Sequence, residues 1–443
     1  MRGDCMADKK TLITLVIIST AYIAGVANIQ GFLALLPMVQ EEFLLSKTQV
    51  GLYSSFHFLS AIMLAVFSGK IVDRLGTKRG LFLGVFIAGI LMILHSFSPY
   101  FGIILCLAFF TGLAFSIVTP SANKAVLELA EPTQRSFFMG IVHSGSGVGG
   151  IIGATLLPIL GGIMGWRPPL VISGSFAVLV AILILLCYKS PNTTSQTNNQ
   201  VQGSQTNNQS NSLDNNLDNN QNKNQNENQG GAGSLKDNLV FFIQNRYLVL
   251  ICIMGFAFGV SASTAIGHYT VYLTGDLGFG STLAGVCLGL VHAGGILGQP
   301  TWGLVNEKVF SGNRRKGLIL HGILITVLFI LYGLVVSPLQ PNPVLVMLLS
   351  FILGYNTIGV IAVYFTTIGE LAPKESVGVI TGIALIFPRT GMIFGPPVFG
   401  YFADITASYA YSWLVIGSLI FIITAGFWYF SRKTELPVTI LSD

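Results

Sequence analysis

Long apolar runs separated by short polar segments make up most of this chain. The first run extends from Leu12 to Pro37 and is longer than the apolar core of a signal peptide. As a helix it can cross about 30 Å of hydrocarbon, so we expect a retained first membrane span. Similar runs recur near residues 49–71, 80–98, 101–127, 137–163, 170–188, 246–272, 282–304, 317–337, 343–368, 377–403 and 411–430. The pattern predicts an all-α membrane protein with twelve transmembrane helices.

The predicted spans form two groups of six, separated by a polar segment. Residues from about Ser190 to Ser234 are mostly Asn and Gln, with almost nothing apolar. Such a segment cannot bury a core, so we expect a disordered linker. The predicted domains are an N-terminal six-helix bundle at 1–189, an Asn/Gln-rich linker at 190–236 and a C-terminal six-helix bundle at 237–443.

An internal repeat with an offset of 242 residues relates the two groups. Glu128, Leu129 and Ala130 match Glu370, Leu371 and Ala372. In the same register, further matches pair Gly112 with Gly354, Gly140 with Gly382, Ile141 with Ile383, Gly149 with Gly391 and Gly153 with Gly395. Two parallel halves related by an axis along the membrane normal are typical of one transporter architecture.

Composition agrees with a lipid environment. Hydrophobic residues make up 52% of the 443 and charged residues 9%, where soluble domains carry roughly a quarter charged residues. So few charges could not cover a water-soluble protein of this length, which excludes that class. The net charge of +5 gives no indication of a nucleic-acid partner.

The position of the charges predicts the orientation. Nearly all cations fall on the side that both termini and the linker share, and the opposite side has only Lys47 and Arg167. By the positive-inside rule, the termini and the linker are expected to be cytoplasmic. The prediction is a multi-pass protein of the plasma membrane, with lipid as its surroundings.

One loop carries a family resemblance. After the second span the chain reads Gly69-Lys-Ile-Val-Asp73-Arg74-Leu-Gly76-Thr-Lys78-Arg79, which resembles the Gly-x-x-x-Asp-Arg-x-Gly-Arg-Lys signature of the major facilitator superfamily. A second, altered copy with Gly303, Glu307 and Lys308 follows the eighth span. The resemblance covers all twelve spans in arrangement and implies the fold of that superfamily, with two six-helix bundles.

The resemblance also implies a role for this loop. In the family, its charges latch the cytoplasmic gate in the outward-open state. The residues that match this network are Gly69, Asp73, Arg74, Gly76 and Arg79, with Glu307 and Lys308 in the second copy. The alternative is that the cations only set the topology.

Two further family motifs bear on the kind of transport. Gly153 to Gly162 in the fifth span and Gly391 to Gly400 in the eleventh resemble the Gly-Pro motif frequent in antiporters, although small residues and Pro also serve helix packing. The intramembrane Arg of proton-coupled drug exporters is missing from the fourth span, where Ala108 stands. A drug/proton antiporter of that type is not indicated.

Arg389 is the candidate substrate anchor. All 18 acidic residues lie in tails, loops, the linker or helix ends, whereas Arg389 lies about halfway along the eleventh span, after Pro388. An Arg at that depth costs about 2.5 to 3.5 kcal/mol, so we expect it to face a water-filled cavity or a partner. The partner could be a substrate anion, because guanidinium suits carboxylate and similar anions. The alternative is a structural Arg bonded to backbone carbonyls.

Several other polar residues are embedded in the predicted spans. His57, His143, His268 and His292 could each bond a substrate, take up a proton or simply satisfy a neighbouring helix. His292 lies on a stripe of small and polar residues that should face the bundle interior. The candidates for substrate binding beside Arg389 are His292, His143 and His268, with Asn28, Gln30, Asn356 and Tyr355 as weaker ones.

These observations predict a secondary active transporter. We expect it to move a small anion, such as a monocarboxylate, by alternating access, either in exchange for a counter-anion or with a proton. The alternatives are an exporter of neutral or amphipathic compounds and, in another class, a membrane sensor without turnover. No motif for an enzyme, a metal or a cofactor is present, and we expect a monomer.

Overall fold

The computed structural model describes residues 9–130, 134–188, 235–373 and 376–432. In the N-terminal half, six helices follow one another with short connections. They are α1 (Lys9–Phe43), α2 (Lys47–Leu75), α3 (Thr77–Ser96), α4 (Phe101–Leu129), α5 (Arg135–Met164) and α6 (Arg167–Cys187). Gly76, at φ +77°, forms the tight turn between α2 and α3, a conformation that glycine adopts without steric cost.

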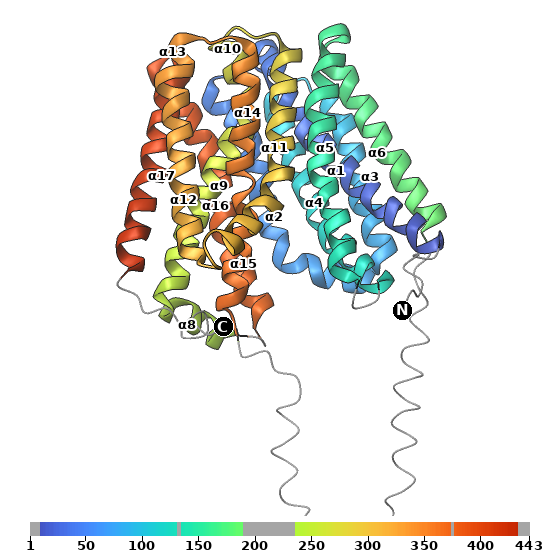
Figure 1. Cartoon of the computed structure of the whole chain (residues 1–443). Helices are drawn as coiled ribbons and strands as arrows, with labels where there is room; N and C mark the ends of the chain where they lie inside the picture. Colours follow the sequence, from blue (N-terminus) through green and yellow to red (C-terminus); the bar gives the residue numbers. More distant parts are fainter. Residues whose placement is uncertain (1–8, 131–133, 189–234, 374–375, 433–443) are drawn as a thin grey trace, which may run out of the picture.

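The C-terminal half begins with the short helix α8 (Leu235–Gln244), and several of its spans are made of consecutive helices (Figure 1). They are α9 (Arg246–Gly267) with α10 (Tyr269–Gly275), α11 (Ser281–Lys308), α12 (Arg314–Leu331) with η1 (Tyr332–Val336) and α13 (Ser337–Leu339), α14 (Pro343–Thr357) with α15 (Val360–Leu371), α16 (Val377–Thr406) and α17 (Tyr409–Ser431). The predicted linker at 190–236 lies outside the described residues up to 234, and its last two residues belong to α8.

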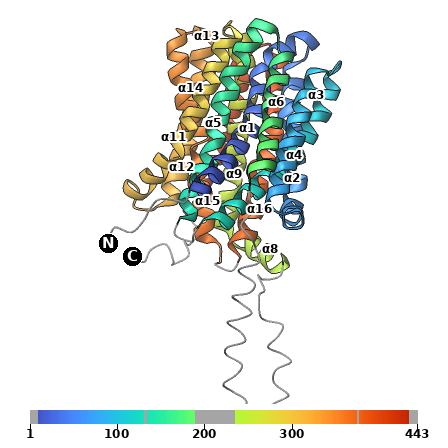
Figure 2. The same ribbon diagram turned by 90° about the vertical axis from the view of Figure 1, so that its right-hand side faces the viewer.

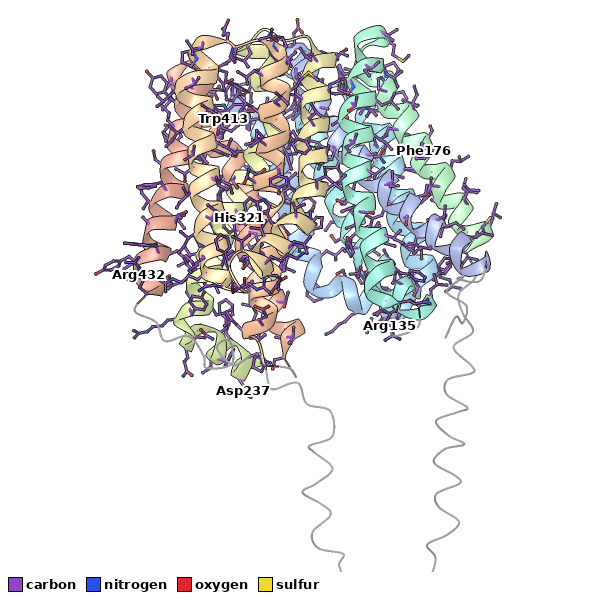
Figure 3. The ribbon with its side chains drawn as sticks, viewed as in Figure 1. Arg135, Phe176, Asp237, His321, Trp413 and Arg432 are labelled. Atoms are coloured by element: carbon purple, nitrogen blue, oxygen red, sulfur yellow. The ribbon has the colours of Figure 1, made fainter. Side chains whose placement is uncertain are left out.

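The described helices confirm an all-α membrane architecture. Eleven are long and apolar enough to cross a membrane, and α2 makes twelve when its two segments, bent by 66°, count as one span. Large apolar side chains such as Leu186 and Ile422 are 70% and 66% exposed, as a lipid-facing surface requires. We call the end where α1 begins and α17 ends the terminal side, and the other end the distal side (Figure 1). Arg135, Asp237 and Arg432 all lie toward the terminal side, whereas Phe176 lies on the outer face of α6 (Figure 3).

Helices that correspond in the internal sequence repeat pack in the same way in the two halves. In the N-terminal half α1 packs on α5, and the equivalent helices α9 and α16 pack together in the C-terminal half. The matched glycines sit at these contacts: Gly153 lies against the Ala27 backbone, and Gly395 lies against the Val260 backbone. Gly112 likewise lies against the His57 carbonyl in α2, and Gly354 against the Val291 carbonyl in α11. The Gly-Pro motifs therefore serve close helix packing, both within each half and between the halves, where Gly400 lies against the Lys47 backbone of α2.

The halves meet mainly along two helix pairs. In addition to the packing within each half, α2 contacts α16 and α5 contacts α11 (Figure 2). This arrangement places the halves side by side, with the helices that join them flanking the centre of the molecule.

Candidate transport site

A cavity of about 760 Å³ lies between the two halves. Its wall comes from α1, α2, α4 and α5 on one side and from α9, α15 and α16 on the other. Along α16 it reaches from Val379, near the terminal end, to Met392. Its volume falls within the range of small-molecule sites in proteins.

Hydrogen bonds and an ion pair between the halves close the distal side. The Asp404 carboxylate, at the distal end of α16, accepts hydrogen bonds from the backbone N–H groups of Lys47 and Thr48, each at 2.8 Å. These are unpaired groups of the first turn of α2, where the helix dipole favours a negative charge. The Lys47 ammonium lies 3.6 Å from Asp276, and Thr270 donates to the Leu33 carbonyl at 3.1 Å.

On the terminal side, the described ion pairs stay within each half. Asp73 pairs with Lys124 of α4 at 2.7 Å. In the other half Arg314 pairs with Glu370, at 2.6 Å, and with Glu307. No ion pair among the described residues joins the two halves on this side. The terminal segment of α2, Phe67–Leu75, also turns away from its first segment by 66°.

The residues of the family signature, and of its second copy, therefore make different contacts in the described state. Asp73 and Glu307 are paired within their own halves, and Gly76 shapes the α2–α3 turn. A Cβ on Gly69 would meet nothing within 4 Å. Arg74, Arg79 and Lys308 have no hydrogen bond or ion pair among the described residues. The latch that the resemblance implies belongs to the opposite, outward-open state and remains a prediction.

Arg389 projects into the cavity wall from α16. It lies twelve residues after Val377 and seventeen before Thr406, or about 18 Å and 26 Å along the helix axis. Among the described residues it has no hydrogen bond or ion pair, and Tyr22 of α1 interacts with it electrostatically. No acidic side chain lines the cavity within the described residues. A mid-membrane cation thus faces an open space without a carboxylate.

The N-terminal half supplies most of the hydrogen-bonding groups on the wall. Tyr22, Gln30 and His57 line it, and the Tyr22 hydroxyl lies 3.4 Å from that of Thr119. Gln30 Oε1 and His57 Nδ1 are buried and have no hydrogen-bond partner in the described structure. The remaining wall is largely aromatic and aliphatic, including Phe58, Phe115, Phe258 and Phe365.

The histidines predicted for the site lie elsewhere. His292 is buried between the halves, with its ring against Gly150 of α5. His143 bonds Asn123 at 2.9 Å and lies behind Tyr22, with ring centroids 5.5 Å apart. His268 uses both ring nitrogens at the distal end, bonding the Tyr409 hydroxyl at 3.1 Å and the Pro396 carbonyl at 2.8 Å. None of the three lines the cavity in the described state, and their part in substrate binding stays a prediction.

Three weaker candidates also have structural partners instead of a place on the wall. Asn28 accepts a hydrogen bond from Ser173 of α6 and is fully buried. Asn356 donates to the Ile352 carbonyl at 2.9 Å, within its own helix. The Tyr355 hydroxyl accepts from Thr301 of α11 at 2.8 Å. These side chains join helices of the same half, or turns of one helix, and do not reach the cavity.

The spacing of residues along the first two spans indicates which side chains line the cavity. Tyr22, Val26, Ile29 and Gln30 are spaced by four, three and one, and all line the cavity from one face of α1. His57, Ala61 and Ser68 do the same on α2. The eighth span has a similar stripe of small and polar residues, but that stripe does not line the cavity.

Two six-helix halves around a central cavity, closed on one side by contacts between the halves, define a membrane transporter of the alternating-access class. The sequence matches the family profile described as the Major Facilitator Superfamily over residues 17–384 and 251–441, and the chain belongs to this family.

The relatives include transporters and a membrane sensor protein. The chain is 23% identical to the hexuronate transporter of Bacillus subtilis over 90% of both chains. It is also 23% identical to a probable sulfoacetate transporter of Cupriavidus necator, over 87% of this chain and 85% of the other. Among solved structures, a bacterial homologue of the human lysosomal transporter Spinster, in an inward-facing and unoccupied conformation, superposes with a TM-score of 0.75 and 16% identity over 98% of both chains. That similarity concerns the fold.

Proposed function

We propose that this transporter moves a small organic anion, such as a monocarboxylate, and that Arg389 anchors it. The observation that carries the proposal is a single guanidinium at mid-membrane depth on the cavity wall, without an ion pair among the described residues. Keeping that charge in the membrane is costly, and an anionic solute offsets the cost in each cycle. A planar guanidinium can bind a carboxylate through two parallel hydrogen bonds.

The relatives support an anionic solute. Hexuronate and sulfoacetate, in whose names two relatives are described, are both organic acids. The present chain differs in detail from both, since identity is only 23%. The relatives therefore support the charge of the solute and not its identity.

The proposed cycle rocks the halves about the cavity. In the described state, the contacts of Asp404 and Lys47 close the distal side. We propose that the terminal side is cytoplasmic, because the predicted loops on that side carry nearly all the cations. The two bundles, 1–189 and 237–443, would then be joined by a cytoplasmic linker in the plasma membrane. Exchange against a counter-anion and symport with a proton are both compatible with this cavity.

The test is uptake into proteoliposomes with labelled lactate, glucuronate, benzoate and sulfoacetate. We expect wild-type protein to take up at least one of them above empty liposomes. Arg389→Gln should abolish that uptake, and Arg389→Lys should retain part of it, because the charge remains while the planar fork is lost. Arg315→Gln is the matched control, since Arg315 lies on α12 and bonds the Trp428 carbonyl, away from the cavity.

A second candidate function follows from the aromatic side chains of the wall. Phe58, Phe115, Phe258 and Phe365 would suit a neutral or amphipathic compound, with Arg389 in a structural role. This function predicts transport of an uncharged aromatic probe that is equal in wild type and Arg389→Gln. Binding of an anion without any uptake would instead indicate a sensor.

A further inference from the structure

His57 is the one histidine on the cavity wall among the described residues. It lies on α2, is 4% exposed, and its Nδ1 has no hydrogen-bond partner in the described structure. The backbone of Ala108 in α4 also acts on the ring.

The protonation of the ring determines what it can do for an anion. In a neutral imidazole one nitrogen is a donor and the other an acceptor. After the ring binds a proton both nitrogens are donors and the ring is charged, and charge-assisted hydrogen bonds to anions are strong.

His57 and Arg389 lie at similar depth on opposite halves. Ser55 of α2 donates a hydrogen bond to the Ile393 carbonyl of α16, which fixes the relative height of the two helices. Toward the terminal side, His57 is two residues beyond Ser55 and Arg389 is four residues beyond Ile393. With a rise of about 1.5 Å per residue, their backbones differ in depth by about 3 Å. Both side chains also line the same cavity, so an anion within it can lie between them.

We propose that His57 binds the anion from the N-terminal half and carries the proton that is transported with it, which makes the chain a proton symporter. In the empty site, Arg389 opposes a second positive charge on His57. An anion between them removes that repulsion and gives the protonated ring a partner. Anion and proton thus raise each other's affinity by the same factor. The proton enters with the anion from one side, leaves with it on the other, and no bond of the anion breaks.

None of the described groups around His57 supplies the negative charge that a bound anion would bring. On α3, His95 acts on it electrostatically, but its Nδ1 bonds the Leu91 carbonyl at 2.7 Å and it does not line the cavity. On α16 the charged group is Arg389, and on α2 itself the nearest titratable side chain is Tyr53. The stretch of α4 that contains Ala108 and Gly112 has no titratable group between Cys106 and Lys124, and α9 has none beyond Cys252.

The inference rests on the proposed anion transport, and the experiment separates the two. The probe is whichever of lactate, glucuronate, benzoate and sulfoacetate shows the greatest Arg389-dependent uptake. With the membrane potential clamped, an inward pH gradient of one unit should accumulate a monoanion about tenfold in wild type. The proton influx should be visible with a pH-sensitive dye inside the vesicles. His57→Gln and His57→Asn should lose this accumulation. Exchange of labelled for unlabelled probe at equal pH should be weakened, because His57 also contacts the anion, but not abolished as in Arg389→Gln.

A binding measurement covers variants that bind but do not turn over. In detergent, the affinity of wild type for the probe should fall about tenfold for each pH unit above the titration of His57, and the variants should show a flat profile. His143→Gln is the rival variant, because His143 lies behind Tyr22 but off the wall, and it should keep the wild-type profile.

Three results would overturn the proposal. The first is that a pH gradient still drives accumulation of the probe in both His57 variants. The second is that His143→Gln loses the coupling to protons while the His57 variants keep it. The third is that wild type shows Arg389-dependent uptake without proton movement. The last result would leave the anion transporter in place and remove only the coupling. If both His57 variants fail to fold, the dye measurement on wild type still decides.

Discussion

Arg389 keeps its position because α16 packs closely against α9. Gly259 of α9 lies against the Pro388 backbone, one residue before Arg389, and a Cβ there would clash with the Pro388 carbonyl. A backbone carbonyl within a packed helix cannot swing aside as a side chain can. The glycine on one helix therefore helps to fix the guanidinium on the other.

We predict that Gly259→Ala shifts α16 and impairs transport. Overpacking of this kind costs about 1–3 kcal/mol. The uptake of the Arg389-dependent probe should fall, and the melting temperature of the purified protein should drop. Gly426→Ala, on α17 where a Cβ meets nothing within 4 Å, is the control and should leave both unchanged. Equal behaviour of the two variants would show that the close approach does not position Arg389.

At the scale of single residues, the sequence predicts Arg389 as the substrate anchor but not the side chains that surround it. Arg389 is identified by its charge, because a charge within an apolar span has few explanations other than a polar contact. The histidines carry no such signal. His57 and His268 both lie within apolar spans. His57 faces the cavity, whereas His268 bonds Tyr409 and Pro396. The difference depends on helix rotation and on partners far away in sequence.

Among the elements, α2 and α16 link the halves at the distal side. Asp404 at the end of α16 takes the place of a capping residue for α2, which belongs to the other half. Ser46 already bonds the Gln49 N–H, so the two carboxylate contacts complete the first turn. We expect the two bonds from Asp404 to break when the distal side opens.

We predict that Asp404→Asn favours opening of the distal side. An amide retains one acceptor but loses the charge that the α2 dipole favours. Because Asp404 is exposed, we expect a shift of only about 1 kcal/mol, or about fivefold. Opening can be measured with Ser55→Cys, because this position is buried between α2 and α16. A membrane-impermeant maleimide added on the distal side should label the new cysteine faster when that side opens. The chain without Ser55→Cys gives the background labelling. Glu41→Gln, at an exposed acid near the distal end of α1, is the control, and an unchanged rate in Asp404→Asn would exclude the contact as a closure.

Asp73→Asn should act in the opposite direction. In the described state Asp73 pairs within its own half, with Lys124. In the outward-open state the family resemblance assigns it to the latch between the halves. Its loss should therefore disfavour distal opening, and the Ser55→Cys residue should be labelled more slowly from the distal side. Faster labelling would contradict a latch and leave Asp73 with its pairing to Lys124 alone.

For the whole molecule, the sequence predicts the architecture well. The apolar runs and the repeat predict twelve spans in two halves, and the described helices agree, because lipid permits few alternatives to a helix. The internal breaks of the spans are not visible in the runs. The division between α9 and α10, and that between α14 and α15, each lie within a single apolar run.

The functional asymmetry of the halves also emerges only at this scale. Although the halves share a repeat, one contributes Tyr22, Gln30 and His57 to the wall and the other contributes Arg389. A solute that contacts both kinds of group joins the halves when it binds. That gives binding a direct connection to the rocking motion, which a site within one half would lack.

The most direct test of the account is uptake of labelled lactate, glucuronate, benzoate and sulfoacetate by proteoliposomes, in wild type and in Arg389→Gln side by side. The account predicts uptake of at least one of these anions by wild type and background uptake by the variant, with Arg315→Gln like wild type. Transport by Arg389→Gln at the wild-type rate, or no transport of any of the four anions by wild type, would contradict it.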